Sequence, residues 1–230
     1  MAVDRLSFSV EEREVVSIIG PNGAGKTTVF NLITGAFRPD EGEILFKEQR
    51  ITGKPSHKLF HLGLARSFQI TNIFQGLTVF ENLRLASQGL LKGLHLFGSV
   101  SRLRESINRA EGILNLLGLW DKRDETAGNL SHGDQRYLEI GIALAARPAM
   151  LLLDEPTAGM TPKETRSTIE LLKRLRQELT ILLIEHDIDL VFEVSDRIIV
   201  MHQGRVLADG SPAEVRSNKQ VQQAYFGEEA

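Results

Sequence analysis

The chain has 230 residues and no cysteine, and its 27 lysine and arginine residues against 30 aspartate and glutamate residues give a formal net charge of −3. The lack of cysteine excludes disulfides, thiolate metal sites and a cysteine nucleophile. A near-neutral charge, 42% hydrophobic content and 25% charged content are ordinary for a globular protein, and they argue against disorder and against an electrostatic surface for nucleic acid.

Membrane-spanning and targeting segments are not predicted. The apolar runs are far shorter than the about 18–20 residues that a membrane helix needs. The N-terminal sequence MAVDRLSFSV has neither the basic nor the apolar part of a signal peptide. We therefore expect a cytosolic protein that reaches a membrane only through a partner.

Short apolar runs alternate with helical patterns along most of the chain. A first buried strand is predicted at Val15–Ile19, followed by a glycine-rich turn and a helix over residues 27–34. Apolar runs bounded by polar residues are typical of strands that are covered on both faces. Further strands are predicted at residues 42–46, 65–68, 150–153, 181–184 and 198–201. Strands that alternate with helices predict a parallel α/β sheet.

The middle of the chain has a helical pattern instead. Residues 81–91 and 102–117 place apolar side chains at helical spacing. Residues from about 72 to 147 are therefore predicted to form a helical subdomain inserted into an α/β core. The chain is predicted to be one domain, residues 1–230, whose core comprises residues 1–71 and 148–230.

The turn after the first strand carries a candidate phosphate-binding motif. Its sequence, GPNGAGKT at residues 20–27, fits the pattern G-x-x-x-x-G-K-[ST] between a strand and a helix. Glycines allow the backbone N–H groups to surround an anion, and the helix start adds unpaired donors and a partial positive charge. Lys26 is predicted to reach the β- and γ-phosphates of a nucleotide, and the Thr27 hydroxyl to bind Mg²⁺. The predicted nucleotide-binding residues of this loop are Asn22, Gly23, Ala24, Gly25, Lys26, Thr27 and Thr28.

A second motif lies where the strand predicted at residues 150–153 ends in Asp154 and Glu155. Charges at the end of a buried strand are costly unless they meet a cation, so Asp154 is predicted to bind Mg²⁺ directly or through water. Glu155 is predicted to orient an attacking water or to act as its general base. A structural turn with solvated acids is the alternative interpretation, and the phosphate loop elsewhere in the chain argues against it.

With these motifs in place, the chain resembles the ATP-binding subunits of ATP-binding cassette (ABC) transporters over nearly its whole length. The segment LSHGDQR at residues 130–136 is similar to the LSGGQ signature of that family, and a helix is expected from about residue 133 to 146. The resemblance implies that Ser131 and Gly133 contact the γ-phosphate held by a second subunit. An ordinary helix start, with Ser131 as the N-cap, is the alternative.

Two further positions match through the resemblance alone. Gln69 is similar to the family glutamine that reaches Mg²⁺ and the attacking water. His186, in the segment IEHD, is similar to the histidine that contacts the γ-phosphate. The resemblance therefore implies an ATPase with an α/β fold: a P-loop NTPase core, which is a parallel sheet with flanking helices, plus an inserted helical subdomain and a small N-terminal β region.

Several segments resemble the ATPases of branched-chain amino acid uptake systems. They are the Asp-Gln-Arg form of the signature, AGM at residues 158–160, VMHQG at residues 200–204 and AYFG at residues 224–227. The resemblance implies ATP and Mg²⁺ as cofactors and a place at the inner face of the plasma membrane. The implied partners are transmembrane permease subunits and a second ATPase subunit, identical or paralogous, with no nucleic acid. The ATPase of a urea-type importer or of a lipid-type exporter stays open as an alternative.

Two alternatives come from other functional classes. A soluble ABC mechanical ATPase acting on DNA would carry a long coiled coil between the phosphate loop and the signature, whereas 62 residues without sustained heptads lead from Gln69 to Ser131. A non-catalytic nucleotide-binding regulator would lack Lys26 or Glu155.

Three features depart from the family pattern. The signature has His132 and Asp134 where its commonest form has glycine and glutamine. Thr161 stands where the family usually has an aspartate, and the segment from Thr161 to Glu164 is predicted to start a helix with a capping box. The sequence also begins later than most members of the family. We therefore expect either a truncated start or an adenine that is held mainly through its phosphates.

Overall fold

The computed structural model describes residues 2–67, 73–88 and 100–226. Within these residues, six strands form one sheet in the order β4–β5–β6–β1–β7–β8, in which β8 is antiparallel to β7 and the other neighbours are parallel. The strands are β1 Val15–Ile19, β4 Leu64–Arg66, β5 Met150–Asp154, β6 Thr180–Ile184, β7 Arg197–His202 and β8 Arg205–Gly210. A separate antiparallel hairpin joins β2 Leu45–Phe46 to β3 Gln49–Arg50.

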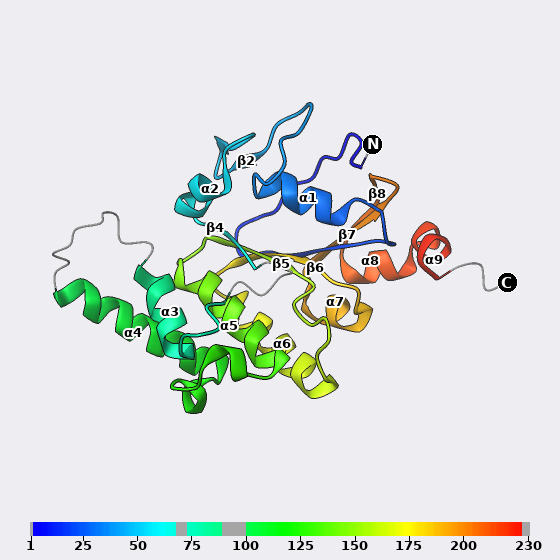
Figure 1. Cartoon of the computed structure of the whole chain (residues 1–230). Helices are drawn as coiled ribbons and strands as arrows, with labels where there is room; N and C mark the ends of the chain where they lie inside the picture. Colours follow the sequence, from blue (N-terminus) through cyan, green and yellow to red (C-terminus); the bar gives the residue numbers. More distant parts are fainter. Residues whose placement is uncertain (1, 68–72, 89–99, 227–230) are drawn as a thin grey trace.

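Helices cover both faces of the sheet. Figure 1 shows α1 and α2 on one face and α5, α6 and α7 on the other. The α-helices are α1 Lys26–Ile33, α2 Ser56–Leu62, α3 Val79–Gln88, α4 Val100–Leu117, α5 His132–Ala145, α6 Pro162–Leu175, α7 Ile188–Val194, α8 Pro212–Ser217 and α9 Lys219–Phe226. The structure therefore has the expected α/β class, with a mostly parallel sheet between helices.

The core has two parts because successive strand side chains point to opposite faces of the sheet. On β5, Leu151 and Leu153 belong to a hydrophobic cluster with residues of α3 to α8, whereas Leu152 belongs to a second cluster with Phe30 of α1 and Leu59 of α2. Every residue of β1 and β5 is buried. This two-sided burial explains why these strands are continuous apolar runs in the sequence.

Helices α3, α4 and α5 pack against one another beside the sheet, at the left of Figure 1. The described residues between 73 and 147 take no part in the sheet. This segment contains the signature-like sequence at the start of α5, so its packing determines where that helix start points.

Some element boundaries differ from the sequence prediction. The strand predicted at residues 42–46 is reduced to Leu45–Phe46. Just before it, the Ile44 N–H donates to the Thr52 hydroxyl at 2.8 Å and the Ile44 carbonyl accepts from the Ile51 N–H at 2.9 Å. Strand β8 was not predicted, since most of its residues are partly exposed and give no continuous apolar run. The described residues before Val15 form no strand, so the small β region of the N-terminal half is the β2–β3 hairpin.

The strand register aligns the carboxyl ends of three strands. Ile184 of β6 pairs with Ile18 of β1 on one side and with Asp154 of β5 on the other. The loops that follow these strands therefore leave the sheet side by side. In open α/β sheets, ligands bind at this edge, so the register predicts the place of a functional site.

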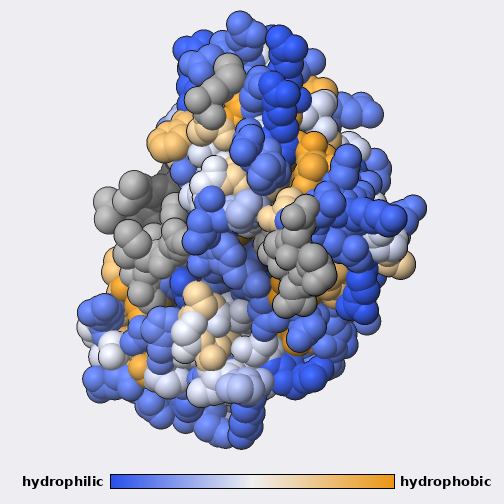
Figure 2. Space-filling model, turned by 90° about the vertical axis from the view of Figure 1, so that its right-hand side faces the viewer, coloured by the Kyte–Doolittle hydropathy of each residue, from blue (hydrophilic) through white to orange (hydrophobic). Residues whose placement is uncertain are grey.

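The outer surface is mainly polar on the face that Figure 2 presents, where hydrophobic residues lie in small groups between hydrophilic ones. Among the residues that the structure describes, no helix combines the length and the apolar character needed to span a bilayer.

Three glutamates fold back onto the starts of helices. Each accepts hydrogen bonds from the backbone N–H and the hydroxyl of a Ser or Thr three residues earlier, and these bonds lower the pKa of the carboxyl below its ordinary value. The pairs are Glu81 with Thr78, Glu164 with Thr161 and Glu214 with Ser211. The last two complete capping boxes at α6 and α8.

We expect these caps to make the free energy of unfolding depend on pH in mild acid. A carboxyl whose pKa is lower in the folded chain stabilises the fold above its unfolded pKa of about 4.3, and that contribution is lost as the pH falls through the folded pKa. The double variant Glu164→Gln, Glu214→Gln should therefore show a shallower fall in urea stability below about pH 5 than the wild type. Glu43→Gln, at an exposed position outside these caps, is the matched control, and equal slopes in all three proteins would contradict the expectation.

Candidate functional site

The phosphate loop lies between β1 and α1. Gly25 is the N-cap of α1 with φ 103°, and a Cβ built on it would lie 2.4 Å from the carbonyl oxygen of Ala2, so glycine alone fits here. Because α1 starts at Lys26, the N–H groups of Lys26, Thr27 and Thr28 belong to its first turn and have no partner within the helix. These donors and the positive end of the helix dipole suit an anion.

The remaining loop residues divide into an exposed rim and a buried support. Asn22 and Gly23 are exposed, and no atom lies within 4 Å of a Cβ built on Gly23. Ala24 is buried in the cluster on the α1 face of the sheet, and its carbonyl oxygen accepts a 3.0 Å hydrogen bond from the Gly204 N–H. The loop is thus fixed to the turn after β7 while its rim stays open to a ligand.

The Lys26 side chain lies inside the loop. It is 6% exposed, and its Nζ donates to the carbonyl oxygens of Gly20 at 2.7 Å and Pro21 at 3.1 Å. Burial lowers the pKa of Lys26, and the negative charges of Glu155 and Asp154 oppose this shift. The ammonium group is therefore close enough to the carboxylates after β5 to interact with them.

Asp154 ends β5 with a carboxylate whose two oxygens differ. Its Oδ2 accepts a 2.7 Å hydrogen bond from Nη2 of Arg66 on β4, whereas its buried Oδ1 has no hydrogen-bond partner in the part of the chain that the structure describes. Arg66 also donates to Oδ1 of Asn31 on α1 at 2.7 Å, and its guanidinium lies 5.6 Å from the centre of the Phe30 ring. Arg66 thus connects the acidic strand end to the helix that follows the phosphate loop.

The residues at this point fit Mg²⁺. A buried acceptor without a partner is costly, and a hard cation on the unpaired Oδ1 of Asp154 would satisfy it. The Thr27 hydroxyl sits on the exposed first turn of α1 and can supply a second oxygen. Among the described residues, no group of three or more His, Cys, Asp or Glu can hold a metal by itself. A site with few protein ligands is usual where Mg²⁺ is shared with nucleotide phosphates.

Glu155 and His186 lie in contact. The Glu155 N–H donates to the Ile184 carbonyl at 2.8 Å, and its backbone has φ 48°, which is uncommon for a side-chain-bearing residue. Its Oε1 lies 2.9 Å from Nε2 of His186. This distance allows a hydrogen bond, in which Nε2 is the donor when the carboxyl is ionised, because a carboxylate only accepts. The structure therefore brings together the residues predicted as water-orienting group and γ-phosphate sensor.

The signature-like residues form the start of α5. Ser131 is its N-cap: its Oγ accepts from the Asp134 N–H at 3.2 Å and donates to Oδ2 of Asp134 at 2.8 Å, and Lys122 forms an ion pair with the same Oδ2. A Cβ built on Gly133 would lie 2.3 Å from Oε1 of Glu164, so a larger residue here would displace the side chain of the glutamate that caps α6.

Within the part of the chain that the structure describes, the signature and the phosphate loop are not joined. Across the described residues, no hydrogen bond or ion pair links Ser131 or Gly133 to residues 20–28. Gln69 lies outside the described residues, so its predicted catalytic and metal-binding roles stay predictions. The site in one chain therefore contains the loop, Asp154, Glu155 and His186.

Sequence reasoning missed Arg66 and Glu185. An arginine inside a buried strand requires an anionic partner, and this signal could have singled out Arg66. Glu185 follows an apolar strand directly and is 3% exposed. A carboxylate between a buried strand and His186 was a comparable signal in the sequence. Neither residue stands at a position that the motifs marked.

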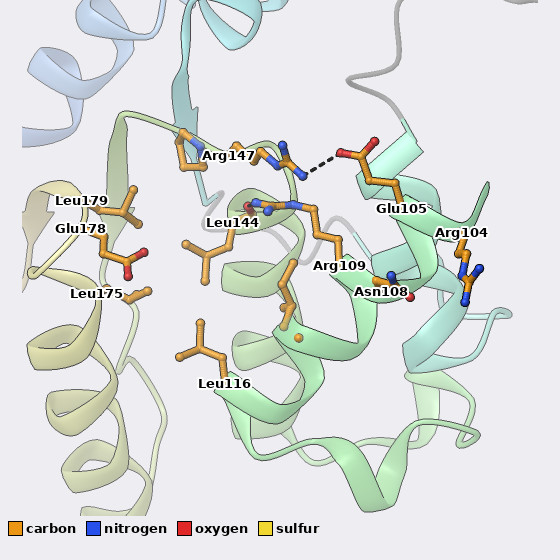
Figure 3. Close-up of a pocket in the computed structure, with 13 residues that line it drawn as sticks. Arg104, Glu105, Asn108, Arg109, Leu116, Leu144, Arg147, Leu175, Glu178 and Leu179 are labelled. Carbon is orange, nitrogen blue, oxygen red and sulfur yellow. Dashed lines mark hydrogen bonds and ion pairs between the residues drawn. The ribbon is translucent and has the colours of Figure 1, made fainter. Parts of the chain in front are cut away.

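A separate pocket of about 820 Å³ lies between α4 and the ends of α5 and α6 (Figure 3). Glu105 and Arg147 form a 2.8 Å ion pair beside it, and Arg109 donates to the carbonyl of Ala145 at the end of α5. Its apolar lining includes Leu116, Leu144, Leu175 and Leu179. Arg147 and Leu179 precede β5 and β6, so the pocket lies toward the amino ends of these strands and contributes no residue to the site.

Comparisons with known proteins agree over almost the whole chain. The family model described as ABC transporter matches residues 3–158, and the model described as branched-chain amino acid ATP-binding cassette transporter matches residues 205–230. The high-affinity branched-chain amino acid transport ATP-binding protein LivG of Salmonella typhimurium is 45% identical, over 99% of this chain and 92% of that protein. BraF of Pseudomonas aeruginosa, with the same description, is 44% identical with the same coverage.

Solved structures give the same result. A nucleotide-free ATP-binding cassette from an ABC transporter superposes with a TM-score of 0.84 at 34% identity, over 99% of this chain and 93% of that chain. The ADP conformation of the cassette MJ1267 gives a TM-score of 0.85 at 34% identity with the same coverage. A dimeric cassette, MJ0796 bound to ADP and phosphate, gives 0.79 at 28% identity, over 92% of this chain and 90% of that chain.

Proposed function

The chain belongs to the ABC transporter family of ATP-binding subunits, and from this membership we propose that it hydrolyses ATP to power the uptake of branched-chain or related amino acids. The relatives that share 44–45% of its sequence are ATP-binding proteins of branched-chain amino acid transport. The protein is accordingly an ATPase that binds nucleotide.

One observation carries the proposal for the site. The phosphate loop, the acidic pair and His186 follow β1, β5 and β6, whose carboxyl ends are aligned by the Ile18–Ile184–Asp154 register. The groups that we propose to hold phosphate, bind a cation and orient water thus follow strand ends at one edge of the sheet. Phosphoryl transfer needs mainly such positioning and charge stabilisation.

We assign the following roles to these groups. Residues 22–28 and the Lys26 ammonium bind the phosphates. Mg²⁺, held by Asp154 and Thr27, would neutralise phosphate charge. Glu155 orients a water that attacks the γ-phosphorus and accepts its proton, while the bond to the β–γ bridging oxygen breaks, so that ADP and inorganic phosphate form. His186, whose imidazole ring is in contact with Glu155, contacts the γ-phosphate.

We propose that the site is completed by a second subunit. Ser131 and Gly133 stand at a helix start that can bind anions, and among the described residues neither has a hydrogen bond or ion pair to residues 20–28 of its own chain. A second copy or a paralogue would bring its signature to this loop, so that two nucleotides lie between two subunits. The solved dimer of a related cassette with ADP and phosphate supports this arrangement.

We further propose how the chain meets the membrane. The whole chain acts as one ATP-binding domain, in which residues 72–147 form a helical subdomain inserted into the core, residues 1–71 and 148–230. Transmembrane permease subunits dock near residues 69–81, between these parts, and hold the protein at the inner face of the plasma membrane. The membrane contact is made only through these partners.

The test uses two nearly isosteric variants of Ser131. Asp and Asn are both good N-caps, but the Ser131 hydroxyl also donates to the Asp134 carboxylate at 2.8 Å. The amide of Ser131→Asn can replace this donor and should keep the melting temperature, whereas the second carboxylate of Ser131→Asp should lower it. Both rates are therefore measured well below the lower of the two melting temperatures. The carboxylate of Ser131→Asp repels a γ-phosphate, whereas Ser131→Asn is neutral, so we expect about 10-fold or more loss of hydrolysis in Ser131→Asp relative to Ser131→Asn.

The same assay measures the dependence on a second subunit. Specific ATPase activity should rise with protein concentration, because the site forms only on association. The shared site would be contradicted by equal rates in the two Ser131 variants together with a wild-type specific activity that stays constant when the protein is diluted until it is monomeric.

A further inference from the structure

Glu185 is a buried acid that the assigned roles leave unused. It follows β6 directly and is 3% exposed. Burying a carboxylate is costly unless its oxygens accept hydrogen bonds. Its surroundings therefore indicate what it holds in place.

Three donors surround the Glu185 carboxylate. Oε1 accepts from the backbone N–H of Thr157 at 2.8 Å and from the Thr157 hydroxyl at 2.5 Å, and Oε2 accepts from the backbone N–H of His186 at 3.0 Å. Thr157 is also buried, at 8% exposure. One carboxylate thus joins the loop after β5 to the loop after β6, across 28 residues of sequence.

The two anchored residues flank the reactive pair. Thr157 lies two positions after Glu155, and His186 is itself the partner of Glu155 through the 2.9 Å contact between Nε2 and Oε1. The main chain of Glu155 is already tied to β6, because its N–H donates to the Ile184 carbonyl. Because Glu185 also fixes Thr157 and His186, the main chain on both sides of the Glu155–His186 contact is held in place.

We propose that Glu185 is a positioning residue for ATP hydrolysis: its carboxylate fixes Thr157 and His186 and thereby keeps Glu155 and His186 in contact. It does not touch the nucleotide, and it acts through these two neighbours. The inference rests on the proposed function, because it concerns the residue that orients the attacking water.

Glu185→Gln is the direct test. The amide has one acceptor oxygen and one donor nitrogen. In either orientation, the amide nitrogen must therefore face the backbone N–H of Thr157 or that of His186, and that hydrogen bond is lost. We expect kcat for ATP hydrolysis to fall about 10- to 100-fold, because even small displacements of reacting groups slow catalysis by such factors. The KM for ATP should stay within about twofold of the wild-type value. The exposed Glu170→Gln on α6 is the matched control and should hydrolyse ATP like the wild type.

Two measurements separate positioning from a general loss of structure. In the Glu155→Gln background, Glu185→Gln should cause little further loss in single-turnover hydrolysis, because its effect passes through Glu155. Thr157→Val removes one of the three bonds and should lower kcat by about 5- to 10-fold, and Thr157→Ser, which keeps the hydroxyl, should recover most of that loss. If Glu185→Gln does not fold, the comparison of Thr157→Val with Thr157→Ser provides the test.

The proposal is overturned by a folded Glu185→Gln with a kcat within about twofold of the wild type, or by losses that multiply in the Glu155→Gln background. Equal activity of Thr157→Val and Thr157→Ser also overturns it. Hydrolysis by the wild type and its loss in Glu155→Gln test the proposed function separately. An active wild type with an unaffected Glu185→Gln therefore refutes only the present inference.

Discussion

Replacing Glu155 with Gln is expected to lower ATP hydrolysis by about 10²- to 10⁴-fold, the usual contribution of a positioned general base. Gln has the size of Glu and can still accept a hydrogen bond from Nε2 of His186, so the 2.9 Å contact can persist. What the variant loses is the negative charge and the proton-accepting oxygen next to the attacking water. The phosphate loop is unchanged, so ATP binding should remain.

The consequence for assembly can be measured together with the rate. A variant that binds ATP but does not hydrolyse it should accumulate the closed pair of subunits, which we expect to see as an ATP-dependent dimer in size-exclusion chromatography. The exposed Glu170→Gln should form no such stable dimer and should keep the wild-type rate. Hydrolysis by Glu155→Gln at the wild-type rate would show that Glu155 has no part in activating water.

The sequence pattern predicted the sheet edge because its signals are local. A continuous apolar run followed by glycines or by an Asp-Glu pair identifies a strand end without knowledge of its neighbours. That the ends of β1, β5 and β6 lie side by side depends on the strand order β5–β6–β1, which no local pattern encodes. The motifs of the family suggested this grouping, and the register gives its physical basis.

The contacts that support the site could not be predicted in the same way. Arg66 and Asp154 are 88 residues apart, and Glu185 and Thr157 are 28 apart. Pairs of this kind depend on which strands become neighbours and on side-chain reach, and a single sequence fixes neither. Strand β8 was missed for a different reason, since its half-exposed residues give neither a buried run nor a strict alternation.

The second large effect is expected at Lys26. Its ammonium is buried within the loop and donates to two loop carbonyls, so it helps to shape the loop as well as to attract phosphate. Lys26→Met keeps the length of the side chain and removes the charge. A charge-assisted hydrogen bond is worth about 1.5–3 kcal/mol, so ATP affinity should fall by about 10- to 150-fold. Hydrolysis should fall further, because negative charge on the γ-phosphate oxygens must be stabilised during transfer.

Isothermal titration with ATP and with ADP distinguishes the two roles of Lys26. A phosphate contact that extends to the γ-phosphate predicts a larger loss of affinity for ATP than for ADP, whereas a loop that has only lost its internal support should bind both nucleotides equally poorly. Lys47→Met, at an exposed position in the β2–β3 turn, is the matched control for loss of one positive charge. Because burial lowers the pKa of Lys26 in the nucleotide-free chain, kcat/KM of the wild type, which reports the free enzyme, should fall at a lower alkaline pH than that at which an exposed lysine deprotonates. Lys26→Met should lack that alkaline fall in its residual rate, and a wild-type ATP affinity in this variant would remove Lys26 from the phosphate site.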